Sequence, residues 1–186
     1  MSGGEPSAAD IVAFWRAVGP ERWFEKDESL DAEIRRRFLG LHEAAASGKL
    51  ASWEQNAEGA LALLILFDQF PRNMFRGQRR AFATDPLALA IASRAILNGF
   101  DSDKSGVLPD MRTFFFLPFM HSEELADQEK ALAFYRVHGD AESLKYAELH
   151  ADIIRHFGRF PHRNAVLGRV TTPEEQAFLD DGGFAG

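Results

Sequence analysis

Apolar residues recur with a helical period along almost the whole chain, and this period limits the fold more than any other feature. In the first segment the shared helical face carries Ile11, Phe14, Trp15 and Val18. Gly19-Pro20 ends that segment, and Ile34, Phe38 and Leu41 repeat the pattern after the acidic cap region Asp27 to Asp31. No segment shows the alternation of apolar and polar residues that is typical of a β-strand. We therefore predict an all-α protein of about eight helices in stacked antiparallel hairpins, with no readable tetratricopeptide consensus.

Capping residues divide this pattern into separate helices. The stretch Ala60 to Phe67 is apolar on nearly every side, which predicts a helix at the centre of the core. Gly139 and Gly158 are expected just past the ends of two later helices. The predicted helix starts are Ser52 with Gln55, Thr84 or Asp85 with Pro86, Ser122, Asp140, and the capping box at Thr172.

Length and composition restrict the class of protein. At 186 residues the chain should bury roughly 70% of its unfolded surface, so we predict a single helical domain over 1–186. The absence of cysteine excludes thiol catalysis and disulfides, and it suits the reducing cytosol. The N-terminal stretch shows no signal peptide, and no apolar run approaches the ~20 residues that span a bilayer. With a net charge of −7, we expect a soluble, cytoplasmic protein that binds neither nucleic acid nor membrane.

Two distant stretches read almost alike: "FDQFPRN" at 67–73 and "FGRFPHRN" at 157–164. We call them the first and the second corner. Because proline lacks an N–H and restricts the preceding residue, Pro71 and Pro161 are each predicted to lie just beyond a helix end. Each corner overlaps a window with four arginines and neither acid nor lysine: Arg72, Arg76, Arg79 and Arg80, then Arg155, Arg159, Arg163 and Arg169. Arginine is suited to planar, two-pronged recognition of carboxylate or phosphate.

A third segment, "MRTFFFLPFMHSEE", lies between the corners. Pro118 is predicted to break a helix, and His121-Ser122 to begin the next one. A helix start offers free N–H groups and a partial positive charge, which attract anions. His121 would then contact an anionic ligand, or it would act as a simple cap residue.

The corners have three interpretations, one of which is that they are mere surface decoration; the other two assign them a role. In the first, they are a buried salt-bridge lock between two helix hairpins, because Asp68 at the end of an apolar helix needs a cationic partner. In the second, they also line a ligand pocket, and we expect them to pack near each other. Arg72, Arg159 and Arg163 would carry charge, and Asn73 and Asn164 would orient the ligand. The complete set of candidate ligand-binding residues is Asp68, Arg72, Asn73, His121, Arg159, His162, Arg163 and Asn164.

The common catalytic and cofactor motifs are missing. The chain has no phosphate-binding glycine loop, no dinucleotide fingerprint and no nucleophile elbow. None of the histidines follows an acid at the Glu-x-x-His spacing, and His150 and His156 do not share a helix face. We therefore expect neither a metal site nor a cofactor. General acid–base chemistry involving Asp68, His121, His150 or His162 stays open, and no catalytic residue can be assigned.

Three long segments resemble one known family: "LLILFDQFPRNMFRG", "FFFLPFMHSEELADQ" and "IIRHFGRFPHRNAVLGR", in this order. They resemble the bacterial domain of unknown function 924 family. The similarity extends over nearly the whole chain, including "ERWFEKDESLDAEIRRRF" near its start. It implies an all-helical, tetratricopeptide-like fold. It implies no activity, because the family itself is uncharacterised.

Three functions are compatible with these observations. The first is binding of a small anionic molecule, a carboxylate or a phosphate, in a pocket built from the FDQFPRN, PFMHSE and FGRFPHRN segments. The second is a tetratricopeptide-like module that binds a peptide or protein partner, with structural corners. The third is hydrolysis or transfer on the bound anion, for which the sequence offers no identifiable nucleophile.

Overall fold

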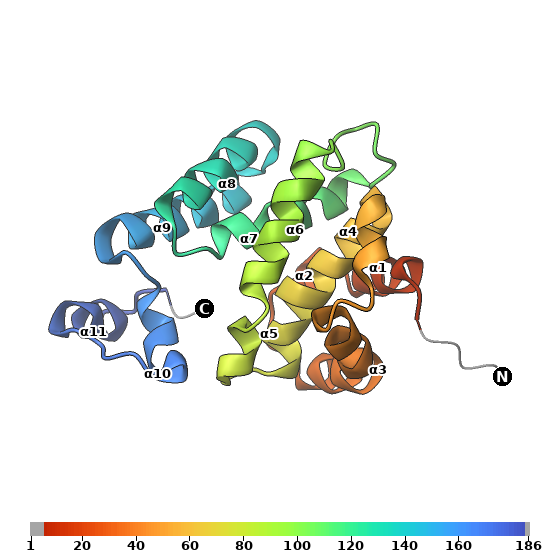
Figure 1. Cartoon of the computed structure of the whole chain (residues 1–186). Helices are drawn as coiled ribbons and strands as arrows, with labels where there is room; N and C mark the ends of the chain where they lie inside the picture. Colours follow the sequence, from red (N-terminus) through yellow and green to blue (C-terminus); the bar gives the residue numbers. More distant parts are fainter. Residues whose placement is uncertain (1–5, 185–186) are drawn as a thin grey trace. The chain divides into compact units, whose positions relative to one another are not determined.

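A computed structural model describes residues 6–184, and they form helices joined by turns, with no strand among them (Figure 1). The all-helical prediction is confirmed. This part of the chain contains eleven α-helices, more than the eight or so expected, because four of them are only four or five residues long. Hydrophobic periodicity cannot resolve such short turns. No helix within 6–184 is long and apolar enough to cross a membrane.

The chain separates into two compact units, which we describe one at a time. Unit 1 contains residues 6–76 and 80–118, and unit 2 contains residues 77–79 and 119–184. The prediction of a single domain stays a prediction.

Unit 1 is built from two long helices, α3 and α6, and a series of shorter ones. Its elements are α1 (Ala8–Val18), α2 (Pro20–Trp23), α3 (Glu28–Ala46), the 3-10 helix η1 (Ala51–Gln55), α4 (Ala57–Leu64), the π-helix η2 (Ile65–Gln69), α5 (Phe70–Met74), α6 (Asp85–Leu97) and the 3-10 helix η4 (Pro109–Phe115). The 3-10 helix η3 (Arg79–Phe82) and α7 (Leu117–Met120) lie where the chain changes unit.

Aromatic rings form the centre of unit 1. Phe70, the second phenylalanine of the first corner, is fully buried, with its ring 4.9 Å from Phe38 and 5.5 Å from Trp15. Phe114 packs edge-on against Trp23 at 4.9 Å. Since buried aromatic rings contribute large contact areas, these residues fix α1, α3 and α5 against one another.

Some predicted helix starts are right and others are shifted. Asp140 caps α9 (Ala141–Phe157), and the Thr172 capping box opens α11 (Pro173–Asp180), as predicted. The Ser52–Gln55 prediction is wrong, because that stretch is a 3-10 helix and Asn56 caps α4. Ser122 lies three residues before the start of α8 (Leu125–His138) and accepts the Glu124 N–H instead. In both errors a turn comes before the helix, and local spacing does not distinguish a turn from a first helical turn.

The prediction that Pro71 lies beyond a helix end is wrong. α4, η2 and α5 follow one another without a break, so Pro71 lies inside a continuous helical run. The N–H of Phe70 donates to Ile65, five residues back, as in a π-helix. Widening the helix by one residue lets the chain continue through a proline that would otherwise break it.

Two side chains compensate for the hydrogen bonds that this π-turn disturbs. Pro71 has no N–H to give to the carbonyl of Phe67, and the Thr84 hydroxyl donates to that oxygen at 2.7 Å. The carbonyl of Leu66 accepts from Nδ1 of buried His42 at 2.9 Å. Burial lowers the pKa of His42 despite this bond, so the ring is neutral and its Nδ1 carries the proton.

Unit 2 consists of a helix hairpin and a smaller C-terminal group. The hairpin helices α8 and α9 lie side by side (Figure 1). Left-handed Gly158 ends α9, and Pro161 follows that end, as predicted. Pro161 opens the 3-10 helix η5 (Pro161–Arg163), which leads into α10 (Asn164–Leu167) and then α11.

Replacing Thr84 by valine should destabilise the protein by about 1–3 kcal/mol, because the buried Phe67 carbonyl would lose its donor. Ser93→Ala is the matched control. The Ser93 hydroxyl also donates to a carbonyl, that of Leu89, but this oxygen lies in the regular helix α6 and keeps its backbone partner. Urea unfolding of both variants measures the difference. Equal stability of Thr84→Val and the wild type would contradict this account of the π-turn.

Candidate functional site

The eight candidate residues fall into two groups, one in each compact unit. The first corner, with Asp68, Arg72 and Asn73, belongs to unit 1. Unit 2 contains the other members, which are His121, Arg159, His162, Arg163 and Asn164. That all three segments line one pocket, with the two corners packed together, stays a prediction.

Arg72 of the first corner is held by side chains and backbone of its own unit. Its guanidinium donates to Asp85 at 2.9 Å and to the Ala81 carbonyl, lies 3.8 Å from Asp68, and stacks on Phe82 at 4.6 Å. Burial would lower the pKa of Arg72, but the charges of Asp85 and Asp68 outweigh it and raise this pKa. Asp68 is 1% exposed and accepts a hydrogen bond from the adjacent Gln69 amide. We expect Asp68 to need a cationic partner, and Arg72 of the same corner is one such partner.

Asn73 fixes α5 to the start of α3. Its amide donates to Asp31 at 2.8 Å, and Arg76 donates to both oxygens of the same carboxylate at 2.9 and 3.0 Å. Such a two-pronged pair orders both partners. Asn73 and Arg76 therefore have a structural role in unit 1.

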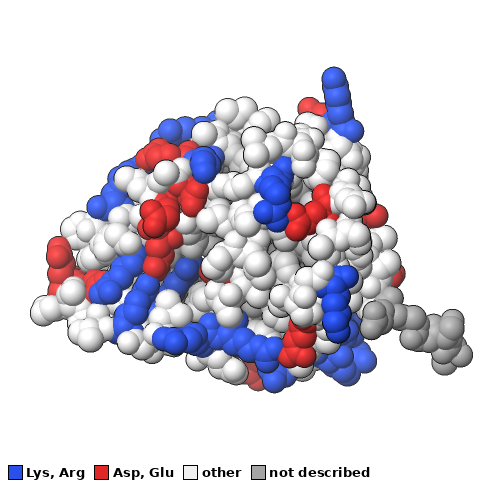
Figure 2. All heavy atoms as spheres, in the orientation of Figure 1, with Lys and Arg blue, Asp and Glu red and all other residues white. Residues whose placement is uncertain are grey.

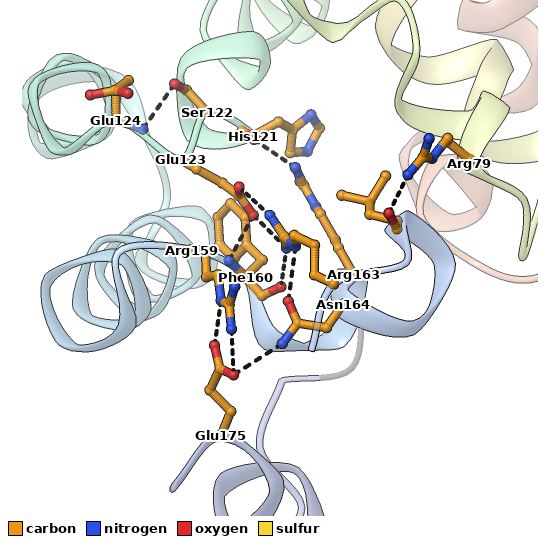
Figure 3. Close-up of polar contacts among 12 residues, drawn as sticks. Arg79, His121, Ser122, Glu123, Glu124, Arg159, Phe160, Arg163, Asn164 and Glu175 are labelled. Atoms are coloured by element: carbon orange, nitrogen blue, oxygen red, sulfur yellow. Dashed lines mark hydrogen bonds and ion pairs between the residues drawn. The ribbon is translucent and has the colours of Figure 1, made fainter. Parts of the chain in front are cut away.

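The second corner delivers Arg159 to the buried carboxylate of Glu175 (Figure 3). The two donor–acceptor distances are 2.5 and 2.8 Å, and a third bond joins Arg159 to the Val170 carbonyl at 2.9 Å. The Thr172 N–H also donates to Glu175, closing the capping box of α11. The hydrogen bonds from Arg159, and then that from the Thr172 N–H, lower the pKa of Glu175 to about 2 against the opposing effect of burial.

Asn164 links this pair to a second one. Its amide donates to Glu175 at 3.1 Å, while its oxygen accepts from Arg169 at 2.9 Å. Arg169 donates in turn to both oxygens of Glu123, at 2.6 and 3.0 Å. Burial would raise the pKa of Glu123, but the bonds from Arg169 and from the Phe160 N–H lower it. The result is one continuous network, with fully buried Asn164 at its centre (Figure 3).

Arg163 and His162 lie near the ring of Phe160, and the backbone carbonyl of His121 accepts a hydrogen bond from Arg163. Arg163 is 7% exposed, donates to the His121 carbonyl at 3.0 Å and stacks on Phe160 at 4.4 Å (Figure 3). The His162 ring lies 5.6 Å from Phe160. Buried His150 lies 5.4 Å from the same ring, and burial lowers its pKa to about 4, with smaller contributions from the charges of His121 and Arg163.

All eight arginines of the two windows make hydrogen bonds within the protein. Arg79 and Arg163 donate to backbone carbonyls. The other six pair with carboxylates, and the acids are Asp85, Asp31, Glu43, Glu129, Glu175 and Glu123. Sequence reasoning missed these acids as site residues. The signal that could have found them is the lack of acid in both windows, which requires that partners come from elsewhere in the chain.

Unit 2 also has a surface groove between α9 and α11, with a volume of about 580 Å³. Its apolar lining comes from Leu149, Ile153, Phe157 and Phe178, and its charged rim from Asp152, Arg155, His156 and Glu174. His156 and Glu174 pair across the two helices at 2.9 Å. Unlike the buried network, the groove offers side chains that a partner can reach.

The described residues provide little support for a specific reaction. Within 6–184, no group of three His, Cys, Asp or Glu side chains is placed to hold a metal ion. The acid–base hypothesis built on Asp68, His121, His150 or His162 stays a prediction.

Fold and site together define an all-helical protein whose arginine-rich corners bind carboxylates of the chain itself. A family model described as bacterial protein of unknown function (DUF924) matches residues 11–183, and the chain belongs to this family. A solved structure of a protein of unknown function from Agrobacterium tumefaciens is 48% identical, covering 94% of this chain and 97% of that one, with a TM-score of 0.89. Comparison with curated proteins finds no match. The family resemblance inferred from the three segments is confirmed.

Replacing Arg159 by methionine should lower the stability of the protein, because the Glu175 carboxylate would lose its cation. Arg155→Met is the matched control. Arg155 also pairs with two carboxylates, Glu129 and Asp152, but these contacts are exposed, so losing them should cost much less stability. Chemical unfolding at neutral pH compares the two variants. Similar losses of stability in both variants would mean that burial of Glu175 does not strengthen its ion pair with Arg159.

Proposed function

We propose that this protein is an interaction module that binds a short peptide segment of a partner protein in the groove between α9 and α11. The observation that carries the proposal is that the hydrogen-bonded arginines and the accessible side chains of unit 2 lie in different places. The arginines of the second corner are engaged inside the protein, whereas the groove combines an apolar floor with a charged, accessible rim. A tetratricopeptide-like arrangement and a cytoplasmic location are part of the proposal.

The apolar surface continues along α9 beyond the groove. Tyr146, Leu149, Ile153 and Phe157 recur at helical spacing, so they share one face of α9. Tyr146 and Leu149 are large apolar side chains that remain exposed on this face. A partner helix would match this stripe with apolar side chains at i, i+4 and i+7. Because the rim carries both signs of charge, the partner's flanking residues would be mixed in charge as well.

The distribution of charge is consistent with a protein partner. On the face drawn in Figure 2, lysine and arginine side chains lie beside aspartate and glutamate side chains at several places. Binding of nucleic acid would instead require a broad basic face. The net charge of −7 points the same way, and nucleic acid and membrane are left out of the proposed partners.

Selection of displayed peptides against the full-length chain tests this proposal. We expect enriched peptides with apolar residues at helical spacing, and we expect Leu149→Asp to weaken their binding by about tenfold or more, as a charge placed against an apolar anchor should. Val137→Asp is the control, because Val137 is 73% exposed on α8 and does not line the groove. If no peptide is enriched, or if binding survives Leu149→Asp, the groove is not the binding site.

A second candidate function is binding of a small anion, carboxylate or phosphate, at His121, His162 and Arg163. The observation that favours it is that Arg163, His162 and His150 surround Phe160, with the His121 carbonyl bound to Arg163, in a protein of net negative charge. Hydrolysis or group transfer on such an anion would take place at the same site, and this enzymatic alternative stays a prediction.

Thermal unfolding with added phosphate tests the anion site. We expect phosphate to raise the melting temperature of the wild type, by an amount equivalent to roughly 2.7 kcal/mol at a hundredfold excess over Kd. Arg163→Met should abolish that increase, whereas Arg155→Met should retain it. An increase that is identical in both variants would reflect a general salt effect, and this candidate would then be dropped.

A further inference from the structure

One face of α9 is exposed and has the spacing of a helix that packs against another helix. Leu149 lies at the centre of this face and is 36% exposed, and Tyr146, about one turn before it, is 46% exposed. Ile153 follows Leu149 by one turn and is almost fully buried. Large apolar side chains that share an exposed helix face are typical of a surface that another helix covers.

Ionisable side chains flank this apolar centre, and their signs reverse about Leu149. Lys145 lies four residues before Leu149 and Asp152 three residues after it, which places them about 6 Å and about 4.5 Å away along the helix axis. Glu142 and His156 lie seven residues before and after Leu149, so they share its side of the helix. The order along the face is therefore acid, base, leucine, acid, histidine.

The inner pair of this pattern can be reached by a partner. Within the described residues 6–184, Lys145 forms no ion pair, and it is exposed. Asp152 pairs with Arg155 at 2.6 Å, but its side chain is still 71% exposed, so a second cation can approach it. His156 is already paired with Glu174 across the groove, which makes the outer pair the weaker one.

The pattern is complementary to itself in the antiparallel direction. A two-fold axis that passes beside Leu149, perpendicular to α9, reverses the helix and keeps each edge of the face on its own side. Lys145 of each copy then faces Asp152 of the other, and Tyr146 faces Ile153, so every contact forms twice. A face of one charge would require a partner of the opposite charge, whereas signs that reverse about a central leucine match a second copy.

We propose that α9 is a self-association surface, on which α9 of a second copy packs antiparallel with Leu149 at the two-fold axis. This inference rests on the proposed function, because it names the partner that covers the apolar stripe of α9. A single helix pair buries less area than a standard protein interface. The dimer is therefore weak and forms at protein concentrations of roughly 10 μM and above.

Sedimentation equilibrium of full-length variants tests the charge pattern. Lys145→Glu places two acids opposite each other, and Asp152→Lys places two lysines opposite each other, so each variant should weaken the dimer at least about tenfold. An equimolar mixture of these two variants should recover a dimer, because both contacts again join opposite charges. Glu148→Lys is the matched control. Glu148 is exposed on α9 but lies off this face, and its reversal should change the dimer constant less than about twofold.

A disulfide tests the position of the two-fold axis. The chain contains no cysteine, so a crosslink reports only on a cysteine that is introduced. Two cysteines can be bridged only when their Cα atoms lie within about 7 Å, which in the proposed dimer holds at the axis. Under mild oxidation Leu149→Cys should form a covalent dimer at least about tenfold faster than Val137→Cys, because the dimer raises the effective concentration of the two thiols. Val137 is 73% exposed on α8 and lies off the face.

The outcomes separate this inference from the proposed function. A chain that stays monomeric, with no faster crosslink in Leu149→Cys, overturns the inference. Displayed peptides that still bind through Leu149 would in that case identify a foreign partner and leave the proposed function in place. A dimer that neither Lys145→Glu nor Asp152→Lys weakens also overturns the inference, because the copies then meet elsewhere. A dimer that follows the charge exchange while no displayed peptide is enriched supports the inference and removes binding of a foreign peptide.

Discussion

The carboxylate of Glu175 accepts hydrogen bonds from three different segments of unit 2. Arg159 comes from the turn after α9, Asn164 from the start of α10, and the Thr172 N–H from the start of α11 itself. Because a buried carboxylate without partners is costly, each donor constrains the others, and the C-terminal group is ordered around one anionic group. The interface of α11 with α9, and the groove beside it, depend on this arrangement.

The two corners show that a repeated sequence can have two different structural outcomes. Pro161 follows the end of α9, where left-handed Gly158 has already stopped the helix. Pro71 lies inside a helical run, and a π-turn absorbs it. The difference lies in the surroundings, since Thr84 and His42 satisfy carbonyls that the π-turn leaves to side chains. In unit 1 tertiary contacts thus override the local tendency of proline to end a helix.

The arginines are specific for carboxylates, as their chemistry suggested, but the carboxylates belong to the protein. Arg72, Arg76, Arg159 and Arg169 all reach acids that lie outside their own windows. The second corner therefore has a structural role, because it holds α11 in place and with it the groove between α9 and α11.

Local interactions are what the sequence by itself determined. The helical class, the Asp140 cap, the Thr172 capping box and Gly158 at the end of α9 depend on residues within one or two turns of each other, so spacing alone reveals them. The tertiary structure decided which acid meets which arginine and how the chain passes through Pro71. Periodicity carries no information about contacts between residues far apart in the chain, such as Asp31 with Arg76 or Glu123 with Arg169. Those pairs form only when packing of the apolar faces brings distant segments together.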